Sequence, residues 1–429
     1  MDMHLVRYGD EGYNVKLLQY ALKRAGMDLG SIDGIFGRRT LRALQQFQRD
    51  RGLLSDGVAG KLTWAALFPY ITGYTLHRLV QGDSYYLLSR RYGIPVPLIA
   101  AANPTLEEGN LQVGESVTVP LNLPVVTGEM PFSSLLTGLM AQGLLRRYPF
   151  IQSYSIGSSV MGRPLTALQI GEGPKQVGYN AAHHGNEWIT TPVLLRFVEE
   201  FARAYVLGED VAGLPAKELF AAATVHVVPL VNPDGVDLVT GAIATGDSYF
   251  EQARALSAYY PGIPFPEGWK ANIQGVDLNL QYPAGWDIAR RIKYAAGFTR
   301  PGPRDFVGLS PLSAPESRAM ARWTEDRDFA LTLAYHTQGE TIYWRYEDYE
   351  VQNARQIGAT FAGLSGYALE DTPYASGHAG YKDWYIQTYL RPGYTIEAGR
   401  GENPLPLSDF ESIYAANLPI LAQGLTLAP

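Results

Sequence analysis

The segment that follows the apolar run QVGYNAA carries two side chains able to bind one metal ion. His184 and Glu187 lie three residues apart, so on a turn or at a helix start both face the same side. Zinc accepts imidazole nitrogen and carboxylate oxygen, and a catalytic zinc keeps one position for water. Among seven histidines this spacing arises easily by chance. Its position after a predicted strand, with Gly185 permitting close approach, favours a metal site.

A third ligand is expected from another predicted strand. The segment LTLAYH ends at His336, which has the same placement at a strand end as His184. An ordinary core histidine is the alternative for this position. The chain contains no cysteine, so any transition metal must be held by histidine and carboxylate.

A further carboxylate ends a strand that is otherwise apolar. The segment GYTIEAG places Glu397 there, where a carboxylate is unfavourable unless it is hydrogen-bonded, paired or used in catalysis. Beside zinc, glutamate is the usual general base, because it takes the proton of the water that attacks a carbonyl. The three candidate ligands and Glu397 together predict metal-dependent hydrolysis.

The elements that must position these side chains alternate between strands and helices over residues 133–427. The predicted strands are LTALQIG, QVGYNAAH, TVHVVPLVN, FALTLAYHT and GYTIEAG, and the helices include PVLLRFVEEFARAYV and PESRAMARWTED. This alternation predicts an α/β domain whose mixed, mostly parallel sheet is covered by helices on both faces. Ligands of such sheets bind beyond the carboxyl ends of the strands.

Six segments of this region, in their order along the chain, resemble the zinc metallocarboxypeptidase family of the carboxypeptidase A type. They are HHGNEW, NPDG, GVDLN, LAYHTQG, YASGHAGYKDW and TIEAG. The resemblance covers residues 133–427 and implies one Zn²⁺ ion per chain. It implies that the ion is held by His184, Glu187 and His336, with Glu397 as the general base.

The resemblance also implies roles for residues around the metal. Tyr374 corresponds to the tyrosine of a mobile loop that closes over the substrate, and Asn279 in GVDLN orients the substrate. Lys270 in GWKAN takes the place of the arginine that polarises the scissile carbonyl. A lysine can still stabilise an oxyanion, so the chemistry survives this exchange.

The chain departs from the family pattern where an ordinary C-terminal carboxylate is recognised. Asn186, a candidate substrate contact, stands where the family commonly has arginine, and Leu280 replaces the arginine that pairs with that carboxylate. An apolar side chain does not replace a bidentate guanidinium, which counts against plain carboxypeptidase activity. Lys382 and Arg400 are the candidates to bind a carboxylate instead; ordinary surface cations are the alternative.

Three further histidines are not expected to bind the metal. His183 precedes the first ligand and is expected to pack against it or orient it. His226 lies within the predicted strand TVHVV and is expected in the core. His378 belongs to the tyrosine loop and is expected to be exposed to solvent.

Residues 4–70 have the periodicity of three short helices. Apolar residues recur at helical spacing in each, with Leu62, Ala65 and Leu67 expected on one face of the third helix. The segments VKLLQYALKRAG, DGIFGRRTLRALQQFQRDRGL and DGVAGKLTWAAL resemble the peptidoglycan-binding domain type 1. This resemblance implies a small helical domain that binds cell-wall polymer.

Residues 73–121 have a strand, helix, helix, strand order. The segments YTLHRLVQGDS, YYLLSRRYG, VPLIAAAN and LQVGESVTVPL resemble a LysM domain, which implies binding to glycans that contain N-acetylglucosamine. The segment NLPVVTGEMPF at 122–132 is rich in proline and is interpreted as a linker to the catalytic region.

Composition narrows the possible partners and locations. The 429 residues include 35 Lys and Arg against 42 Asp and Glu, and no basic motif supports nucleic-acid binding. The longest apolar stretch is too short to span a bilayer, so no membrane segment is expected. The start MDMHLVRYGDEG lacks an apolar signal core. The expected location is the cytoplasm, including that of a sporulating cell, or the cell wall after release by another route.

The combination of modules predicts a peptidoglycan hydrolase. Two wall-binding modules precede one zinc peptidase, an arrangement that resembles γ-D-glutamyl-L-diamino acid endopeptidases. The resemblance implies cleavage between γ-D-Glu and diaminopimelate (or Lys) in stem peptides. Two alternatives stay open: a conventional zinc carboxypeptidase that acts on ordinary peptides, and a wall-binding protein whose peptidase domain is inactive.

Overall fold

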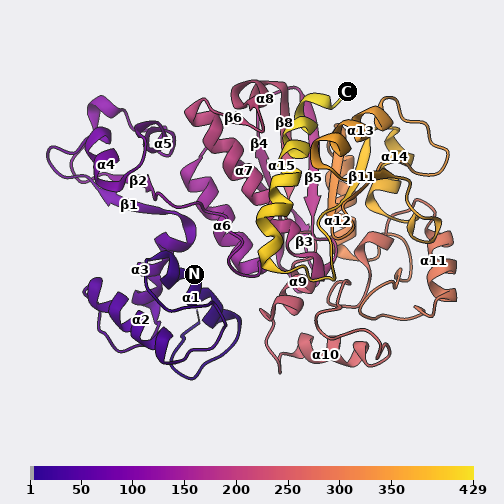
Figure 1. Cartoon of the computed structure of the whole chain (residues 1–429), viewed down its shortest axis with the longest axis horizontal. Coiled ribbons are helices and arrows are strands. Elements are labelled where there is room, and N and C mark those ends of the chain that lie inside the picture. Colours follow the sequence, from indigo (N-terminus) through magenta and orange to yellow (C-terminus); the bar gives the residue numbers. More distant parts are fainter. Residues whose placement is uncertain (1–3) are drawn as a thin grey trace. The chain divides into compact units, whose positions relative to one another are not determined.

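The structure is a computed structural model and describes residues 4–429. Residues 1–3, which belong to the N-terminal segment in which no signal peptide is predicted, lie outside the described part. The chain forms two compact units (Figure 1). One extends to Met130 and includes Gly138–Ile151, and the other combines Pro131–Thr137 with Gln152–Pro429.

The N-terminal unit begins with the predicted three-helix arrangement, formed by α1 (Tyr13–Arg24), α2 (Arg38–Asp50) and α3 (Lys61–Thr72). The apolar face expected on α3 is wrong at Leu62, which is 73% exposed, and at Ala65, which is also exposed. The buried side of α3 is instead formed by Trp64, Leu67 and Ile71. The helix is turned relative to the sequence-based interpretation because the bulky Trp64 takes the inner position.

Two equivalent hydrogen bonds fix the turns before α2 and α3. The buried Gln19 side chain accepts from the Gly34 backbone at 2.8 Å, and Gln48 accepts from the Gly57 backbone at 2.9 Å. Both glycines have positive φ, 81° and 72°, which residues with a side chain rarely adopt. Two buried amides therefore hold two Asp-Gly turns in matching conformations.

The second part of this unit has the predicted βααβ order, with β1 (Tyr74–Arg78), α4 (Tyr85–Tyr92), α5 (Val96–Ala101) and β2 (Ser116–Pro120). The two strands pair antiparallel, from Tyr74 opposite Pro120 to Arg78 opposite Ser116. Residues 122–132 contain neither helix nor strand. Helix α6 (Ser134–Arg147) follows.

The second unit is built on an eight-stranded mixed sheet in the order β11-β10-β12-β9-β5-β8-β4-β3. The central strands β12, β9, β5 and β8 run parallel, whereas β3 and β4 join antiparallel at one edge. All five predicted strands are present. The bounds are β3 (Gln152–Ser158), β4 (Pro164–Ile170), β5 (Lys175–Ala181), β8 (Ala223–Val228), β9 (Phe329–His336), β10 (Thr341–Tyr343), β11 (Ala368–Glu370) and β12 (Gly393–Glu397).

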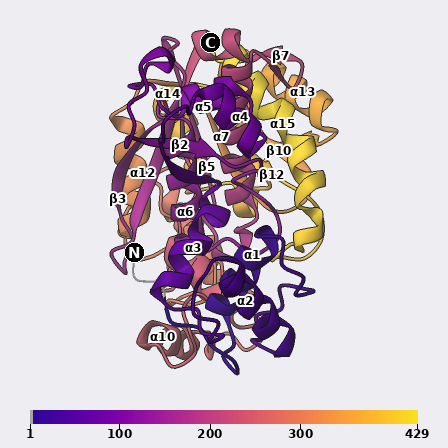
Figure 2. The same ribbon diagram turned by 90° about the vertical axis from the view of Figure 1, so that its left-hand side faces the viewer.

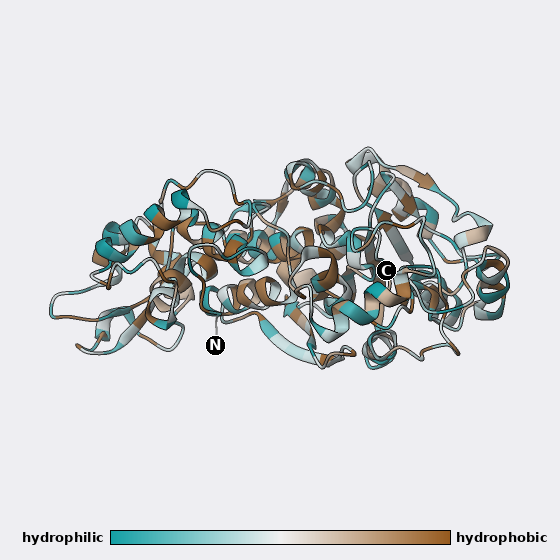
Figure 3. Ribbon diagram, turned by 90° about the horizontal axis from the view of Figure 1, so that it is seen from below, coloured by the Kyte–Doolittle hydropathy of each residue, from teal (hydrophilic) through white to brown (hydrophobic). Residues whose placement is uncertain are grey.

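Helices cover both faces of this sheet, as the strand pattern predicts. Helices α7 (Thr190–Leu207), α13 (Ala354–Ser365) and α15 (Phe410–Leu427) lie on one face, and α12 (Pro315–Glu325) and α14 (Tyr381–Tyr389) on the other. Figure 2 shows α12 and α15 on opposite sides of the strands. The helices carry both apolar and hydrophilic segments in Figure 3, because each buries one face against the sheet.

The remaining helices and the small hairpin lie in the connections, at α8 (Ala216–Ala222), α9 (Pro233–Thr240), α10 (Ser248–Ser257), α11 (Trp286–Ala295), β6 (Asp210–Val211) and β7 (Leu214–Pro215). In the described part of the chain, none of the helices combines the length and the apolar character that crossing a bilayer requires.

Polar side chains gather where the parallel strands end. His184 follows β5, Asn232 follows β8, His336 ends β9 and Glu397 ends β12. Since parallel neighbours end at the same edge of a sheet, these side chains come from distant parts of the sequence into one region. The sheet topology thus positions the candidate site.

Candidate active site

The first two candidate ligands are placed by the turn that leaves β5. His184 caps the 3-10 helix Gly185–Glu187, which turns the chain back so that Glu187 faces the imidazole. A Cβ on Gly185 would lie 2.7 Å from the Gly235 backbone, closer than real Cβ atoms come. Only glycine permits this approach, and its amide donates to the Lys270 carbonyl at 2.9 Å.

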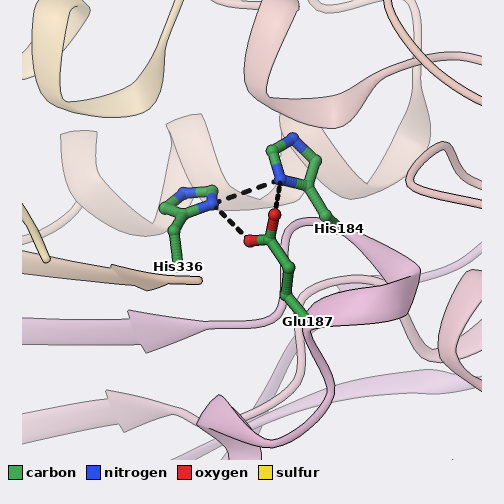
Figure 4. A group of neighbouring side chains, drawn as sticks. All are labelled: His184, Glu187 and His336. Carbon is green, nitrogen blue, oxygen red and sulfur yellow. Dashed lines mark hydrogen bonds and ion pairs between the residues drawn. The ribbon is translucent and has the colours of Figure 1, made fainter. Parts of the chain in front are cut away.

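The three candidate ligands meet around one point (Figure 4). Glu187 Oε1 lies 2.9 Å from His184 Nδ1, Glu187 Oε2 lies 2.9 Å from His336 Nδ1, and the two Nδ1 atoms are 3.3 Å apart. Ligands of tetrahedral zinc with bonds of about 2.1 Å lie about 3.4 Å from one another. The donor types and their spacing therefore fit zinc.

Asp277 orients the first ligand. Its Oδ1 lies 3.1 Å from His184 Nε2, so the opposite nitrogen, Nδ1, faces the metal position. Asp277 also accepts from the Asn279 and Asp305 amides, at 3.2 and 3.0 Å. Asp277 is not among the residues predicted from the sequence, although the carboxylate in the GVDLN motif is a signal for it.

The charges of the cluster are strongly coupled. Burial opposes a charge on His184, but the carboxylates of Glu187 and Asp277 outweigh it and raise the pKa of His184 to about 9. The pKa of Glu187 is held well below its usual range by His184 and Lys270, against the effect of burial. A metal cation at this point replaces protons on the same side chains, so binding releases protons.

Lys270 lies beside the ligands. Its Nζ is 2.8 Å from Glu187 Oε1, and its side chain is 17% exposed. Burial favours a neutral amine, yet Glu187 outweighs it and raises the pKa of Lys270. Lys270 is therefore a positive charge next to the candidate metal position.

Strand pairing places Glu397 beside the third ligand. Strands β9 and β12 are parallel neighbours, and their register sets Glu397 directly opposite His336. Desolvation raises the pKa of Glu397, and the neighbouring His336 partly offsets this. A carboxylate with a raised pKa next to a metal position is suited to accept a proton from water.

Two cavities adjoin this cluster. A cavity of about 180 Å³ contains all three candidate ligands, and a cleft of about 640 Å³ lies beside it. Lys270, Arg304, Tyr343 and Glu397 line both. These four side chains therefore lie where the two spaces adjoin.

The predicted substrate residues divide between the two spaces. Asn279 and Leu280 line the smaller cavity, and Asn279 Oδ1 accepts from the Tyr381 amide at 3.0 Å. Asn186 lines the larger cleft, and its buried Oδ1 has no hydrogen-bond partner among the described residues. Leu280 contributes an apolar side chain to the lining of the smaller cavity.

The two cations predicted to bind a carboxylate have other partners. Lys382 lines the smaller cavity but is buried, and its Nζ contacts Asp383 Oδ1 at 2.5 Å and donates to the Arg345 carbonyl at 2.7 Å. Arg400 is 73% exposed and pairs with Glu340 at 2.6 Å, outside the lining of both cavities. Neither side chain offers a free charge to the catalytic pocket.

The tyrosine of the predicted mobile loop lies outside the pocket in this structure. Tyr374 is 71% exposed and lines neither cavity, although its neighbour Ser376 lines the smaller one. The predicted exposure of His378 is wrong, because this side chain is only 3% exposed. The rings of Tyr374 and Tyr346 cover it, with centroids 4.8 and 6.1 Å away.

The other interpreted histidines lie in the core. His183 is fully buried, stacks on His336 at 5.6 Å and contacts the Tyr282 hydroxyl at 3.1 Å. It therefore supports the third ligand. His226 is buried between Tyr154 and Gln176, both 2.7 Å away, which confirms its predicted position in the core.

Family comparison supports the same region. The zinc carboxypeptidase family matches residues 140–414, which is more than half of the chain. The chain belongs to the zinc carboxypeptidase family. Two further matches lie in the N-terminal unit: a peptidoglycan-binding domain over residues 11–67 and a LysM domain over residues 77–120.

Two bacterial relatives are similar to this chain over 280 residues, which is 65% of its length. Gamma-D-glutamyl-L-diamino acid endopeptidase 1 of Lysinibacillus sphaericus is 42% identical, and 68% of its length is covered. The uncharacterised protein YqgT of Bacillus subtilis is 41% identical, and 73% of its length is covered.

Solved structures confirm the carboxypeptidase fold. Carboxypeptidase A from Helicoverpa armigera is similar with a TM-score of 0.52 and 18% identity, covering 99% of both chains. Thrombin activatable fibrinolysis inhibitor is similar with a TM-score of 0.52 and 17% identity, covering 70% of this chain and 75% of the other. At such identities the likeness concerns the fold.

Proposed function

We propose that this protein is a zinc-dependent peptidase that cleaves the γ-D-glutamyl–diamino acid bond of bacterial peptidoglycan stem peptides. The observation that carries the proposal is the convergence of His184, Glu187, His336 and Glu397 at one cavity. The 42% identical relative named for this bond and the two matches to wall-binding domains support the substrate.

The metal site holds one zinc ion per chain through His184, Glu187 and His336. Zinc supplies Lewis acidity, which makes a water more acidic and polarises a carbonyl. Asp277 keeps His184 in the tautomer that presents Nδ1. His183 limits the movement of His336 by stacking on its ring.

The reaction uses Glu397 as the proton carrier. The carboxylate accepts a proton from the attacking water and then gives it to the nitrogen of the leaving amine, so that the amide bond is exchanged for an acid and an amine. Lys270 stabilises the negative charge that develops on the carbonyl oxygen. Asn279 orients the substrate, and Tyr374 closes over it when its loop moves.

The substrate differs from that of a conventional carboxypeptidase. Leu280 cannot pair with a C-terminal carboxylate, which disfavours ordinary peptides. The peptidoglycan-binding and LysM domains bind the glycan and hold the catalytic unit near the stem peptides, which raises their effective concentration. Peptidoglycan is thus both the bound polymer and the substrate.

Mass spectrometry of purified muropeptides after digestion tests the proposal. Products that end in D-glutamate, together with a released diamino acid or a peptide that begins with one, are expected. Equal or faster hydrolysis of a hippuryl dipeptide would favour a conventional carboxypeptidase. A zinc-loaded protein that cleaves neither substrate would identify an inactive domain.

A further inference from the structure

A loop beside the catalytic pocket carries two cations that share one carboxylate. Arg304 Nε lies 2.6 Å from Asp305 Oδ2, and Lys293 Nζ lies 2.6 Å from Asp305 Oδ1. All three side chains line the smaller cavity. Two positive charges against one negative charge leave this cluster with an excess positive charge, which attracts an anion.

The nearby carboxylates of the pocket do not cancel that excess. Asp277 and Glu187 lie close enough to raise the pKa of Arg304, together with Asp305 and against the effect of burial. However, Asp277 is bound to His184, and Glu187 is shared between the candidate metal ligands and Lys270. Among the described ion pairs, Asp305 is the acidic partner of Arg304.

The loop is fixed to the catalytic residues by backbone hydrogen bonds. The Pro303 carbonyl accepts from the amides of Lys270 and Ala271, at 2.7 and 2.9 Å. The Asp305 amide donates to Asp277 Oδ2 at 3.0 Å. Asp305 also has a φ of 64°, a left-handed conformation that is uncommon for a residue with a side chain. Arg304 is therefore held at a defined place relative to Lys270.

Arg304 differs from the other cations of the pocket in its accessibility. Its side chain is 42% exposed, against 15% for Lys293, 17% for Lys270 and 4% for Lys382. Among the described residues, its hydrogen bond and its ion pair both involve Nε, which leaves the two outer nitrogens of the guanidinium available to a ligand. It lines both the smaller cavity and the larger cleft.

We propose that Arg304 binds a substrate carboxylate next to the scissile amide and so sets specificity. This inference rests on the proposed function. An amide formed through the γ-carboxyl of D-glutamate leaves its α-carboxylate free, and the diamino acid carries an α-carboxylate of its own. The two outer nitrogens of a guanidinium match the two oxygens of either carboxylate. Arg304 thereby binds a carboxylate from a different segment of the pocket wall than the one that contains Leu280.

Three synthetic peptides test this assignment. The first is L-Ala-γ-D-Glu-diaminopimelate, the second has the α-carboxylate of D-glutamate amidated, and the third has the α-carboxylate of the diamino acid next to the scissile amide amidated. We expect Arg304→Gln to lower kcat/KM roughly 10- to 100-fold on peptides that retain the recognised carboxylate. On the peptide that lacks it, the variant and the wild type should be cleaved at equal rates, which identifies the carboxylate.

Matched variants separate recognition from structure. Arg304→Lys keeps the charge without the planar fork and should recover only part of the lost activity. Arg203→Gln removes an exposed arginine that has a 2.6 Å ion pair with Glu209 outside both cavities, and should leave all three rates unchanged. Zinc content and melting temperature should match the wild type in every variant.

The outcomes distinguish this inference from the proposed function. An equal loss on all three peptides, or no loss on any of them, would overturn the role of Arg304 while leaving the cleaved bond established. If the wild type with zinc bound cleaves none of the three peptides, the proposed function fails and the role of Arg304 fails with it.

Discussion

The metal end of the pocket and its substrate-binding rim are built in different ways. The candidate ligands and Glu397 lie at or just after the ends of β5, β9 and β12, so the hydrogen-bonded sheet fixes their relative positions. Arg304, Lys382 and Arg400 lie outside the strands, and the direction of each depends on a local acidic partner. The residues proposed for the chemistry are thus positioned by the sheet, whereas Arg304, proposed for substrate recognition, is positioned by a segment outside the strands.

The strongest test of this contrast is removal of the base. Glu397→Gln preserves the shape of the side chain but not its ability to accept a proton, so kcat should fall by about 10³-fold or more. Zinc stoichiometry, measured by atomic emission, should stay at one per chain because Glu397 is not a ligand. Substantial activity in this variant would show that another group carries the proton.

Glu316, a buried carboxylate outside the pocket, also has a raised pKa, so it tests whether such a shift is confined to the proposed catalytic residues. Glu316 on α12 is fully buried, and desolvation raises its pKa to about 7 although the Val160 amide and Asn272 donate to it. The folded pKa exceeds the ordinary value of 4.5, so the folded state holds this proton more tightly than the unfolded state. Stability should therefore fall as pH rises from about 4.5 to 7, by about 3 kcal/mol.

The measurement compares zinc-loaded wild type with Glu316→Gln. Glutamine does not ionise, so the difference in unfolding free energy between the two proteins should shift in favour of the variant between pH 5 and pH 8. Parallel stability profiles would mean that Glu316 does not titrate in this range. Turnover at a fixed pH should change little, because Glu316 lines neither cavity.

A smaller effect, on zinc affinity, is expected from a change at Asp277, which lies between the metal ligands and the substrate-binding rim. Asp277→Asn keeps an oxygen that can face His184 but removes the negative charge that supports the imidazole. Zinc affinity should fall about 10- to 100-fold, as measured by competition with a chelator. Affinity equal to that of the wild type would mean that the strand ends alone determine the metal site.

The sequence was informative where a residue type and a strand end coincide. His184, His336 and Glu397 follow apolar runs, so their convergence could be predicted from the sheet rule alone. Lys382 could not be assigned in this way, since its pairing with Asp383 depends on how α14 begins. The exposure of His378 was predicted wrongly because Tyr346 covers it from a distant segment and Tyr374 of the same loop folds over it.

The direct opposition of Glu397 and His336 across β9 and β12 leaves little tolerance to change in strand length. Successive side chains of a strand point to alternate faces, so one residue inserted into Gly393–Glu397 would shift the ladder by one step. The acid would then point away from the reaction centre while the sheet kept its backbone hydrogen bonds. Such an insertion would abolish the proposed hydrolysis of peptidoglycan while leaving the two wall-binding domains unchanged.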